Sequence, residues 1–398
     1  MIVNKKILNH NLKEIIMKKM KKLSVSLLVS ALLLMPVGQA FACEDHEKIE
    51  LVSAGSYHSL ALKSDGTVWA WGHNLFGQLG DGSTKESTVP KQVSGLGNVI
   101  KIDAGSGSHS LALKNDGTVW AWGANGQWQV GSPSGSAVTT PTQMVGLDEV
   151  KDITAGSQFN LVLKENGSVW AWGKNELGLG DEALTKASKI PVKVANLDDV
   201  KKVKAGSSHS LALKNDGTVW AWGDNQYGQS GLGKNTYNSK VPVQIEGMTD
   251  IIDISTGYNY SLALKSDGTV WAWGENSYEQ LGINKKTTQY TPVQVMNLEN
   301  VTEVEAGRYY SFAKKEDGTV WAWGSNGHGG FGNGEITNYS LPVEITNLKG
   351  YKTLSSGNIH SLGVSAEGAA FGWGGNSFGQ IGDGTKNIQK QLIKVLGQ

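Results

Sequence analysis

The sequence predicts an all-β fold, a seven-bladed β-propeller of ~50-residue repeats whose ring is closed by its N- and C-terminal strands. Three observations carry this prediction. One aromatic motif recurs seven times at spacings of 50 or 51 residues. Each copy lies within two alternating runs joined by a short turn, the pattern of a β-hairpin. No linker or change in composition interrupts the series from residue 48 to residue 398, so these residues are expected to form one domain.

The repeat is marked by the motif Trp-Ala-Trp-Gly, whose seventh copy reads Phe-Gly-Trp-Gly. Its first aromatic residues are Trp69, Trp120, Trp170, Trp220, Trp271, Trp321 and Phe371. A glycine opens each unit in step with them, at Gly55, Gly105, Gly156, Gly206, Gly257, Gly307 and Gly357. A period of this size is typical of a solenoid, a propeller or an array. The 52 Gly show no three-residue period, and 39% hydrophobic residues suffice for a core, which excludes collagen and disorder.

Each unit is expected to begin with a hairpin. In the first unit, Asp65-Gly66 lies between two alternating runs, which favours a two-residue type I′ turn. That turn would pair Leu62 with Trp69, so that Leu and Trp share one face of the sheet and the small Ala residues share the other.

A sheet with a bulky face and a flat face packs well on a copy of itself, and seven such sheets close into a propeller with short, protected edges. The 13 motif Trp residues are therefore expected to pack in the core rather than to stack on a ligand. In the sixth repeat Lys314 replaces the Leu, and we expect its stem to lie on the ring of Trp321.

The chain ends are expected to meet in the ring. Each unit continues to a strand of the type Val-x-x-Val-x-Ala-Gly, as in residues 200–206. The chain ends at residues 392–398, just before another such strand is due, and residues 49–52 supply one at the opposite terminus.

Residues 1–42 have the features of a signal peptide. A Lys-rich stretch at 18–22 precedes an apolar run at 23–35, which is short for a bilayer span, and the small-x-small sequence at 40–42 suits cleavage. Initiation at Met17 or Met20 would give a more usual length. A buried N-terminal helix is the alternative. With residues 43–47 as a short leading segment, the sequence predicts an exported protein that is secreted or lies at the cell surface.

Cys43 directly follows the expected cleavage site and is a candidate for lipidation. Ala40 and Phe41 depart from the usual Leu-x-small-Cys pattern, and an inert terminal thiol is the alternative. We expect membrane attachment only if Cys43 is lipidated. As the only Cys in the chain, it excludes a disulfide framework and a thiolate zinc cluster.

The charge balance argues against nucleic acid and anionic lipid as partners. Residues 1–42 hold seven Lys and one Glu, so the rest of the chain has 29 basic and 35 acidic residues, a net charge of −6. Arg308 is the only arginine in the sequence. Phosphate recognition favours Arg forks and basic patches.

The segments Gly-x-x-His-Ser-Leu-Ala-Leu, Asp-Gly-Thr-Val-Trp-Ala-Trp-Gly-x-Asn and Gly-Gln-Leu-Gly resemble the regulator of chromosome condensation repeat. The resemblance covers all seven units and implies a seven-bladed propeller. The eukaryotic founder of that family is a guanine-nucleotide exchange factor for a nuclear GTPase, and it uses a wedge-like insertion and a basic tail. The units here are uniform and carry neither feature. They are more similar to a branch of secreted bacterial propellers that inhibit β-lactamases through residues after Ala-Gly and in the Trp-Gly loops.

The hairpins place the Gly-x-x-His segments and the Gly-x-Asn loops at one end of the ring, which we call the loop face. The Asp-Gly turns lie at the other end, the turn face. The loop face varies between repeats and carries aromatic and Arg side chains, which are enriched at binding hot spots. The predicted partner-binding residues are Tyr57, Trp128, Tyr227, Tyr258, Tyr278, Arg308, Tyr309 and Phe378. The alternative for each ring is packing on its own blade.

Four histidines occupy one equivalent position in their repeats: His58, His109, His209 and His360. Phe or Tyr fills this position in the other three repeats, so it requires a flat ring rather than a metal ligand. No nucleophile–base pair, carboxylate pair or phosphate loop is recognisable. We therefore predict a non-enzymatic monomer, without cofactor or metal, that binds a protein through the loop face. A glycan-binding propeller of the cell envelope is the alternative, and exchange-factor activity, β-lactamase inhibition or an axial active site are less favoured.

Overall fold

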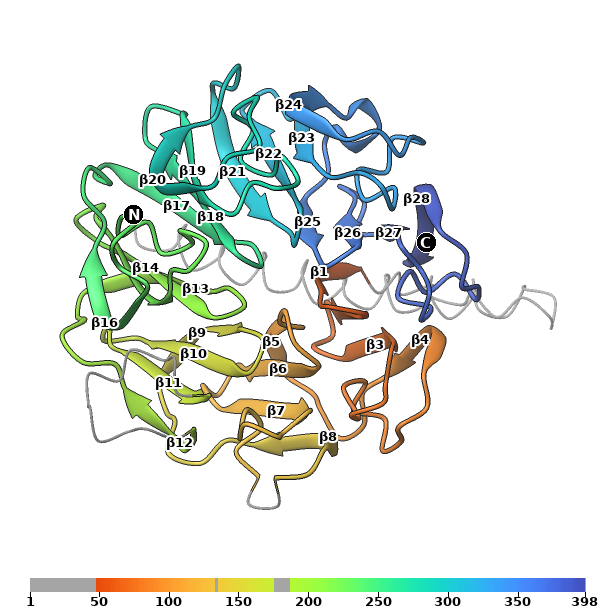
Figure 1. Cartoon of the computed structure of the whole chain (residues 1–398). Coiled ribbons are helices and arrows are strands. Elements are labelled where there is room, and N and C mark those ends of the chain that lie inside the picture. The colour runs from red at the N-terminus through yellow and green to blue at the C-terminus, as the bar shows by residue number, and fades with distance from the viewer. Residues whose placement is uncertain (1–47, 133–134, 175–186, 398) are drawn as a thin grey trace, which may run out of the picture. The chain divides into compact units, whose positions relative to one another are not determined.

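Seven four-stranded antiparallel sheets stand around a central channel and form a propeller (Figure 1). The computed structural model describes residues 48–397 except 133–134 and 175–186, so the predicted signal peptide and Cys43 lie outside the described residues. Each sheet, or blade, is built from consecutive strands, of which the first lines the channel and the fourth lies at the outer rim. The predicted fold class is thereby confirmed. Within the described part of the chain, no helix is long and apolar enough to cross a membrane.

The first four blades contain β1 (Ile49–Ala54), β2 (His58–Lys63), β3 (Val68–Gly72), β4 (Ser87–Gln92), β5 (Val99–Asp103), β6 (His109–Lys114), β7 (Val119–Gly123), β8 (Val138–Gln143), β9 (Val150–Ala155), β10 (Phe159–Lys164), β11 (Val169–Gly173), β12 (Ser188–Lys193), β13 (Val200–Ala205), β14 (His209–Lys214), β15 (Val219–Asp224) and β16 (Asn238–Gln244). The last three contain β17 (Ile251–Thr256), β18 (Tyr260–Lys265), β19 (Val270–Gly274), β20 (Gln289–Gln294), β21 (Val301–Ala306), β22 (Tyr310–Lys315), β23 (Val320–Gly324), β24 (Tyr339–Glu344), β25 (Thr353–Ser356), β26 (His360–Val364), β27 (Ala370–Gly374) and β28 (Gln389–Leu396). A short 3-10 turn, η1 (Thr346–Leu348), lies between β24 and β25.

The hairpin register differs by one residue from the predicted one. Leu62 pairs with Val68, and Ala61 pairs with Trp69. Both motif Trp residues therefore share a face with Ala, while the Leu residues share the opposite face with Val and Ala. The same pairing recurs in every blade, for example in β18 and β19. The expected division into a bulky Leu-Trp face and a flat Ala face was wrong.

The turn explains this shift. The Lys63 N–H donates to the Thr67 carbonyl at 3.0 Å, and in the Asp65-Gly66 pair only Gly66 has a positive φ, +78°. A type I′ turn needs a positive φ at both positions, whereas a three-residue loop needs one left-handed residue after a type I turn. The extra residue in the loop displaces the register by one.

The second Trp of each motif locks neighbouring blades together. Trp273 is fully buried, and its indole N–H donates to the Gln229 carbonyl in a loop of the preceding blade at 3.0 Å. Its ring packs with Leu211, Leu213 and Ile254 in one core cluster. The second Trp is fully buried in all seven blades, which agrees with the predicted core role.

The first Trp of each motif is only partly buried; its polar contacts lie within its own blade, while its ring packs on the core cluster of the preceding blade, as Trp271 does with Leu211 and Leu213. The Trp271 indole N–H reaches the Thr269 hydroxyl at 3.3 Å, and the Lys265 ammonium lies 4.8 Å from the ring centroid. In blade 6 the cation over Trp321 is Lys315 rather than the predicted Lys314, which instead donates to a backbone carbonyl. The shifted register explains this exchange, because Lys314 pairs with Val320.

The chain ends meet as predicted, and each terminal strand completes its own blade. Strand β1 packs beside β25 and β26 of the last blade (Figure 1). The Ile49 N–H donates to the Gly368 carbonyl at 2.9 Å, and the Lys352 ammonium lies 2.8 Å from the Glu50 carboxylate. The ring is therefore closed by packing between two complete sheets.

Candidate functional site: the loop face

A buried belt of aromatic rings and hydroxyls underlies the loop face. His209 Nε2 lies 2.9 Å from Ser261 Oγ in the next blade, and the Tyr260 hydroxyl lies 2.9 Å from Ser311 Oγ. Six such links join consecutive blades. The one interruption among the described residues follows Phe159, which has no polar atom on its ring.

The belt fixes the protonation of its histidines. The Ser261 hydroxyl donates its proton to the Gln229 carbonyl at 2.8 Å, so His209 Nε2 must carry the proton that joins it to Ser261. Burial lowers the pKa of His58, His209 and His360 to about 3, and that of His109 to about 4. The histidines are neutral structural rings, consistent with the requirement for a flat ring. The residues that the structure describes include no group of three His, Cys, Asp or Glu suited to a metal ion.

Among the described residues, the loops of blades 1, 2, 4, 5 and 7 are each held by a buried Asn and a buried Gln, whereas blade 6 has Asn326 and Gly330 at these positions. In blade 5, Asn276 Oδ1 accepts the Leu281 N–H at 2.9 Å, and Gln280 Oε1 accepts the Tyr278 N–H at 2.9 Å. The loop backbone is thus fixed from inside, while the residue at its tip varies between blades. Tyr278 stands at this tip and is 42% exposed.

Four of the predicted residues form one stacked group over blades 5 and 6, which we call the Arg308 cluster. The Arg308 guanidinium lies 4.2 Å from the Tyr258 ring centroid and 4.8 Å from that of Tyr309. The Tyr309 ring lies 4.3 Å from that of Tyr278. Burial raises the pKa of the Tyr309 hydroxyl, against the opposing attraction and hydrogen bonding of Arg308. Side chains from three separate loops are therefore interlocked.

Two further predicted residues meet where the last blade joins the first. The rings of Tyr57 and Phe378 lie 5.2 Å apart in an edge-to-face arrangement, and His73 lies 4.8 Å from Phe378. Phe76 flanks this group and is 41% exposed. Tyr227, from the loop of blade 4, is 42% exposed.

Trp128 lies elsewhere than predicted. It occupies the loop position of a glycine in most other blades, such as Gly77, and has a positive φ of +63°. Gly77 packs on the outer strand of the neighbouring blade, and Trp128 does the same, with the Lys189 ammonium of β12 3.9 Å from its ring centroid. The loop tip in this blade is Gln127. Trp128 therefore lies between two outer rims rather than with the other aromatic residues of the loop face.

A hollow of about 680 Å³ opens between the two aromatic groups of the loop face. The residue after the opening glycine of each unit forms its inner border. Blades 1 to 4 place a serine there, blades 5 and 6 place Tyr258 and Arg308, and blade 7 places Asn358. The hollow is thus bordered by hydroxyls on one side and by the Arg308 cluster on the other, with Tyr57 and Phe76 among its lining residues.

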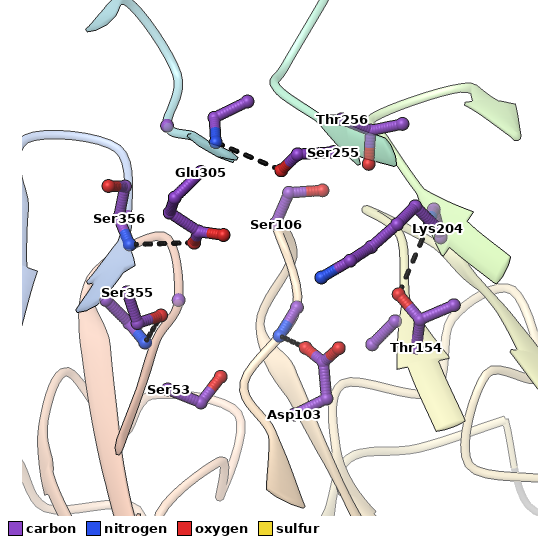
Figure 2. A pocket seen from close by; sticks show the side chains of 18 of the residues that line it. Ser53, Asp103, Ser106, Thr154, Lys204, Ser255, Thr256, Glu305, Ser355 and Ser356 are labelled. Carbon is purple, nitrogen blue, oxygen red and sulfur yellow. Dashed lines mark hydrogen bonds between the residues drawn. The ribbon is translucent and has the colours of Figure 1, made fainter. Parts of the chain in front are cut away.

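The hollow adjoins the central channel, a cavity of about 390 Å³ (Figure 2). Figure 2 shows the Lys204 side chain extending into this cavity, with Glu305 and Asp103 on neighbouring walls. Burial raises the pKa of Glu305 to about 7, although Lys204 opposes this shift. Burial also raises the pKa of Asp103. The channel is therefore polar and charged.

Sequence reasoning missed these channel residues. In six of the seven inner strands, the positions that alternate with buried Val or Ile residues line the channel, as Lys202 and Lys204 do in β13. Charged residues at these positions of a propeller repeat could have predicted a charged central channel. The buried loop Asn and Gln were also visible as repeated letters, but their role as internal loop supports was not recognised.

Comparison with protein-family models gave three matches. The RCC1-like domain matches residues 150–396, and the regulator of chromosome condensation (RCC1) repeat matches residues 65–113 and 116–163. A second model of the same repeat matches residues 49–78. Together these matches extend over most of the ring.

Curated relatives share segments of the propeller. Protein RCC2 homolog of Danio rerio is 32% identical over 125 residues, which cover 30% of this chain and 25% of the relative. Ultraviolet-B receptor UVR8 of Arabidopsis thaliana is 29% identical over 247 residues, which cover 61% of this chain and 44% of the relative. The chain thus spans less than half of the length of these relatives.

Solved structures share the fold. Prp20p of Saccharomyces cerevisiae has a TM-score of 0.75 at 22% identity, covering 89% of this chain and 88% of that one. Human WBSCR16 has a TM-score of 0.74 at 23% identity, covering 83% and 94%.

Proposed function

Because the chain belongs to the RCC1 repeat family, whose propellers are protein-interaction scaffolds, we propose that it binds a protein partner through its loop face and catalyses no reaction itself. Propellers of this kind typically act as regulators or binders. The yeast relative Prp20p is described with binding to Gsp1p and histones and in a complex with Kap60. These ligands of Prp20p are all proteins, which supports a protein as the partner of this chain without identifying it.

The observation that carries the proposal is the difference between the two ends of the ring. At the turn face, five Asp carboxylates and one Asn amide accept the same two hydrogen bonds from the Thr or Ser two residues later. At the loop face the tip residues differ from blade to blade and include exposed aromatic rings. Aromatic rings lose little side-chain entropy on binding and dominate interface hot spots.

The shape of the hollow favours a protein over a glycan as the ligand. A lectin built from repeats would present one small pocket in each blade. The hollow instead has a lining that changes around the ring, from the serines of blades 1 to 4 to Tyr258 and Arg308. A lining of this kind suits one broad epitope, although the hydroxyls and rings keep a cell-envelope glycan as the second candidate.

Site-specific photo-cross-linking tests which face is used. A photoreactive amino acid at Tyr227 or Tyr278 should yield covalent adducts with the partner, because both side chains are exposed at loop tips. The same probe at Ser64 or Ser266, which are exposed in turns of the opposite face, is the matched control. A panel of purified β-lactamases supplies defined first candidates. Adducts obtained only from the turn face would contradict the proposal.

The double substitution Arg308→Ala, Tyr309→Ala should then weaken binding of the identified partner by at least about 2 kcal/mol. The matched pair Ser266→Ala, Glu316→Ala changes exposed turn-face residues and should leave affinity unchanged. The glycan candidate would be favoured if envelope polysaccharide, but no protein, bound in an Arg308-dependent manner.

We also propose that the protein is exported and loses residues 1–42, with the exposed product secreted or held at the cell surface. The basic stretch, apolar run and small-x-small site support this proposal. Intact-mass measurement of the mature protein distinguishes cleavage before Cys43 from lipidation of its thiol. A full-length product in the cytoplasm would contradict export.

A further inference from the structure

We propose that Arg308 is an anion-recognition site that takes a carboxylate side chain from an acidic loop of the partner, inserted into the hollow of the loop face. The inference rests on the proposed function and specifies the chemistry of the partner. It follows from three observations: the immobilisation of the guanidinium, its missing counter-charge and the composition of the hollow.

The guanidinium is held in place before any ligand arrives. It lies 4.2 Å from the Tyr258 ring and 4.8 Å from the Tyr309 ring, and Tyr309 is supported in turn by Tyr278. An Arg side chain normally loses considerable rotamer entropy when it binds. Stacking on two rings removes much of this freedom in advance and leaves the planar edge with its N–H donors as the polar part.

The positive charge of Arg308 has no counter-charge nearby. Among the described residues, no carboxylate oxygen lies within 4.0 Å of the guanidinium. Its Nε is buried and has no hydrogen-bond partner. On the same loops, the Glu275 carboxylate accepts a hydrogen bond from the Asn259 amide at 3.0 Å. Arg308 lines the hollow, so its accessible guanidinium N–H groups can donate to a carboxylate bound there, whereas the buried Nε stays out of reach of a ligand.

The hollow itself is uncharged apart from Arg308. Its other lining residues among those described are serines, amides, glycines, alanines and the rings of Tyr57, Phe76 and Tyr258. The rest of the protein carries a net excess of acidic residues. One cation in a neutral, hydroxyl-rich hollow selects a ligand with one negative charge and further hydrogen-bonding groups around it.

The size of the hollow suits a peptide loop as the ligand. A volume of about 680 Å³ is far larger than a single carboxylate and accommodates several residues. The Ser and Asn groups around the border can bond to the peptide groups of such a loop, while Tyr57 and Tyr258 contact its sides. An Asp or Glu at the tip would reach Arg308 and form the two parallel hydrogen bonds typical of an Arg–carboxylate pair.

The test uses disulfide-closed loops of seven to nine residues, selected from a displayed random library against the whole protein. We expect enrichment of Asp or Glu at the centre of the selected loops. Affinity should fall at least about tenfold for Arg308→Gln, and by an intermediate factor for Arg308→Lys, which keeps the charge but loses the fork. Replacing the central Glu of a selected loop by Gln should cause a similar loss.

A second readout reports on the guanidinium directly. Because Arg308 is the only arginine, the protein has one Arg Nε–Hε resonance in its NMR spectrum. This resonance should shift on titration with a selected loop and remain in place with the Glu-to-Gln loop. Unchanged melting temperatures of the Arg308 variants would show that the loss concerns binding rather than folding.

The outcomes separate the two proposals. Loops that bind at the loop face equally well to Arg308→Gln would overturn the acidic-loop inference and leave the proposed function standing. Selected loops that bind only elsewhere would overturn both. If succinate at matched ionic strength bound as tightly as the loops, the hollow would be a site for small organic acids instead.

Discussion

The loop face and the turn face are built from the same seven repeats, but they are held together in different ways. At the turn face the polar contacts of a motif Trp lie within one hairpin, as Trp271 contacts Thr269 and Lys265, and neighbouring blades are joined by a backbone hydrogen bond, such as that from the Ile251 N–H to the Gly217 carbonyl at 3.0 Å. At the loop face every blade depends on its neighbours, through the aromatic belt and the indole of the second Trp. Internal Asn and Gln supports free the loop tips from a structural role, so binding residues can vary there without loss of the fold.

The largest expected effect is acid destabilisation of the loop face. The unfolded chain protonates its histidines near pH 6.5, whereas the buried His58, His109, His209 and His360 resist protonation until about pH 3 to 4. The unfolded state therefore binds more protons between these values, and stability must fall as the pH drops from 6.5. The slope should approach about 1.4 kcal/mol per pH unit for each histidine, measured from urea unfolding.

A single substitution sharpens this prediction. His209→Tyr introduces the residue that blade 5 has at the same position, Tyr260, and can keep the link to Ser261. It should reduce the acid slope by about a quarter, since one of four such histidines is removed. The turn-face carboxylates, such as Asp65, have a lowered pKa and keep their contribution until the pH falls below their ordinary range. An unchanged slope in the variant would assign acid unfolding to other groups.

The first and second Trp residues of the motif should contribute differently to the free energy of unfolding. Trp273→Ala removes a fully buried ring and its bond to the preceding blade, and should cost about 3–5 kcal/mol. Trp271→Ala removes a partly exposed ring that packs at the edge of a core cluster and whose polar contacts lie within one hairpin, and should cost about 1–2 kcal/mol. Chemical denaturation of both variants provides the comparison, and equal losses would refute the distinction between the first and second Trp.

Filling the gap in the aromatic belt should have a smaller effect on stability, and in the stabilising direction. The Ser210 hydroxyl has no hydrogen-bond partner among the described residues, and the preceding blade carries Phe159 where others have His or Tyr. Phe159→Tyr should place a hydroxyl beside Ser210, as Tyr260 does beside Ser311, and raise stability by about 0.5–1.5 kcal/mol. Phe159→Leu is the control for ring packing and should destabilise. A Tyr variant no more stable than the parent would show that the gap is already satisfied.

The turn face should show the smallest effect. Asn166 accepts hydrogen bonds from the Ser168 N–H and hydroxyl at 3.0 and 2.7 Å, as an Asp does in five other blades. Asn166→Asp should therefore change stability by less than about 0.5 kcal/mol at pH 7. Asn166→Ala removes both bonds and should lower the melting temperature. If the Asp variant behaved like the Ala variant, the turns would not be interchangeable.

Much of the architecture was predictable because it depends on repetition. The period, the opening glycines and the ring-shaped side chain at the position of His58 each recur in register, and a recurring letter reports a recurring environment. The hairpin register was not predictable in the same way, because Asp65-Gly66 suits both a two-residue and a three-residue loop. The choice between them depends on where Lys63 and Thr67 pair, which the dipeptide alone does not determine.

The candidate site was predictable in location but not in grouping. Hairpin topology placed Tyr258, Tyr278, Arg308 and Tyr309 at one end of the ring, yet their stacking depends on which side chains of different blades approach each other. Trp128 shows the limit most clearly: a shift of one position within its loop sends the side chain to the outer rim.

The closure of the ring has a further consequence for how this protein can be cut and rejoined. Both ends of the described chain pack against the same turn, since Lys48 lies beside Gly368, and Gly397 lies beside Gly368 and Ala369. Every sheet is also continuous in sequence, so no blade is divided between the ends. A circular permutant that joins these ends and opens the connection between β16 and β17 should therefore assemble the same ring. The order of the blades around the ring is therefore a property of the fold, whereas the choice of the blade that comes first in the sequence can be changed.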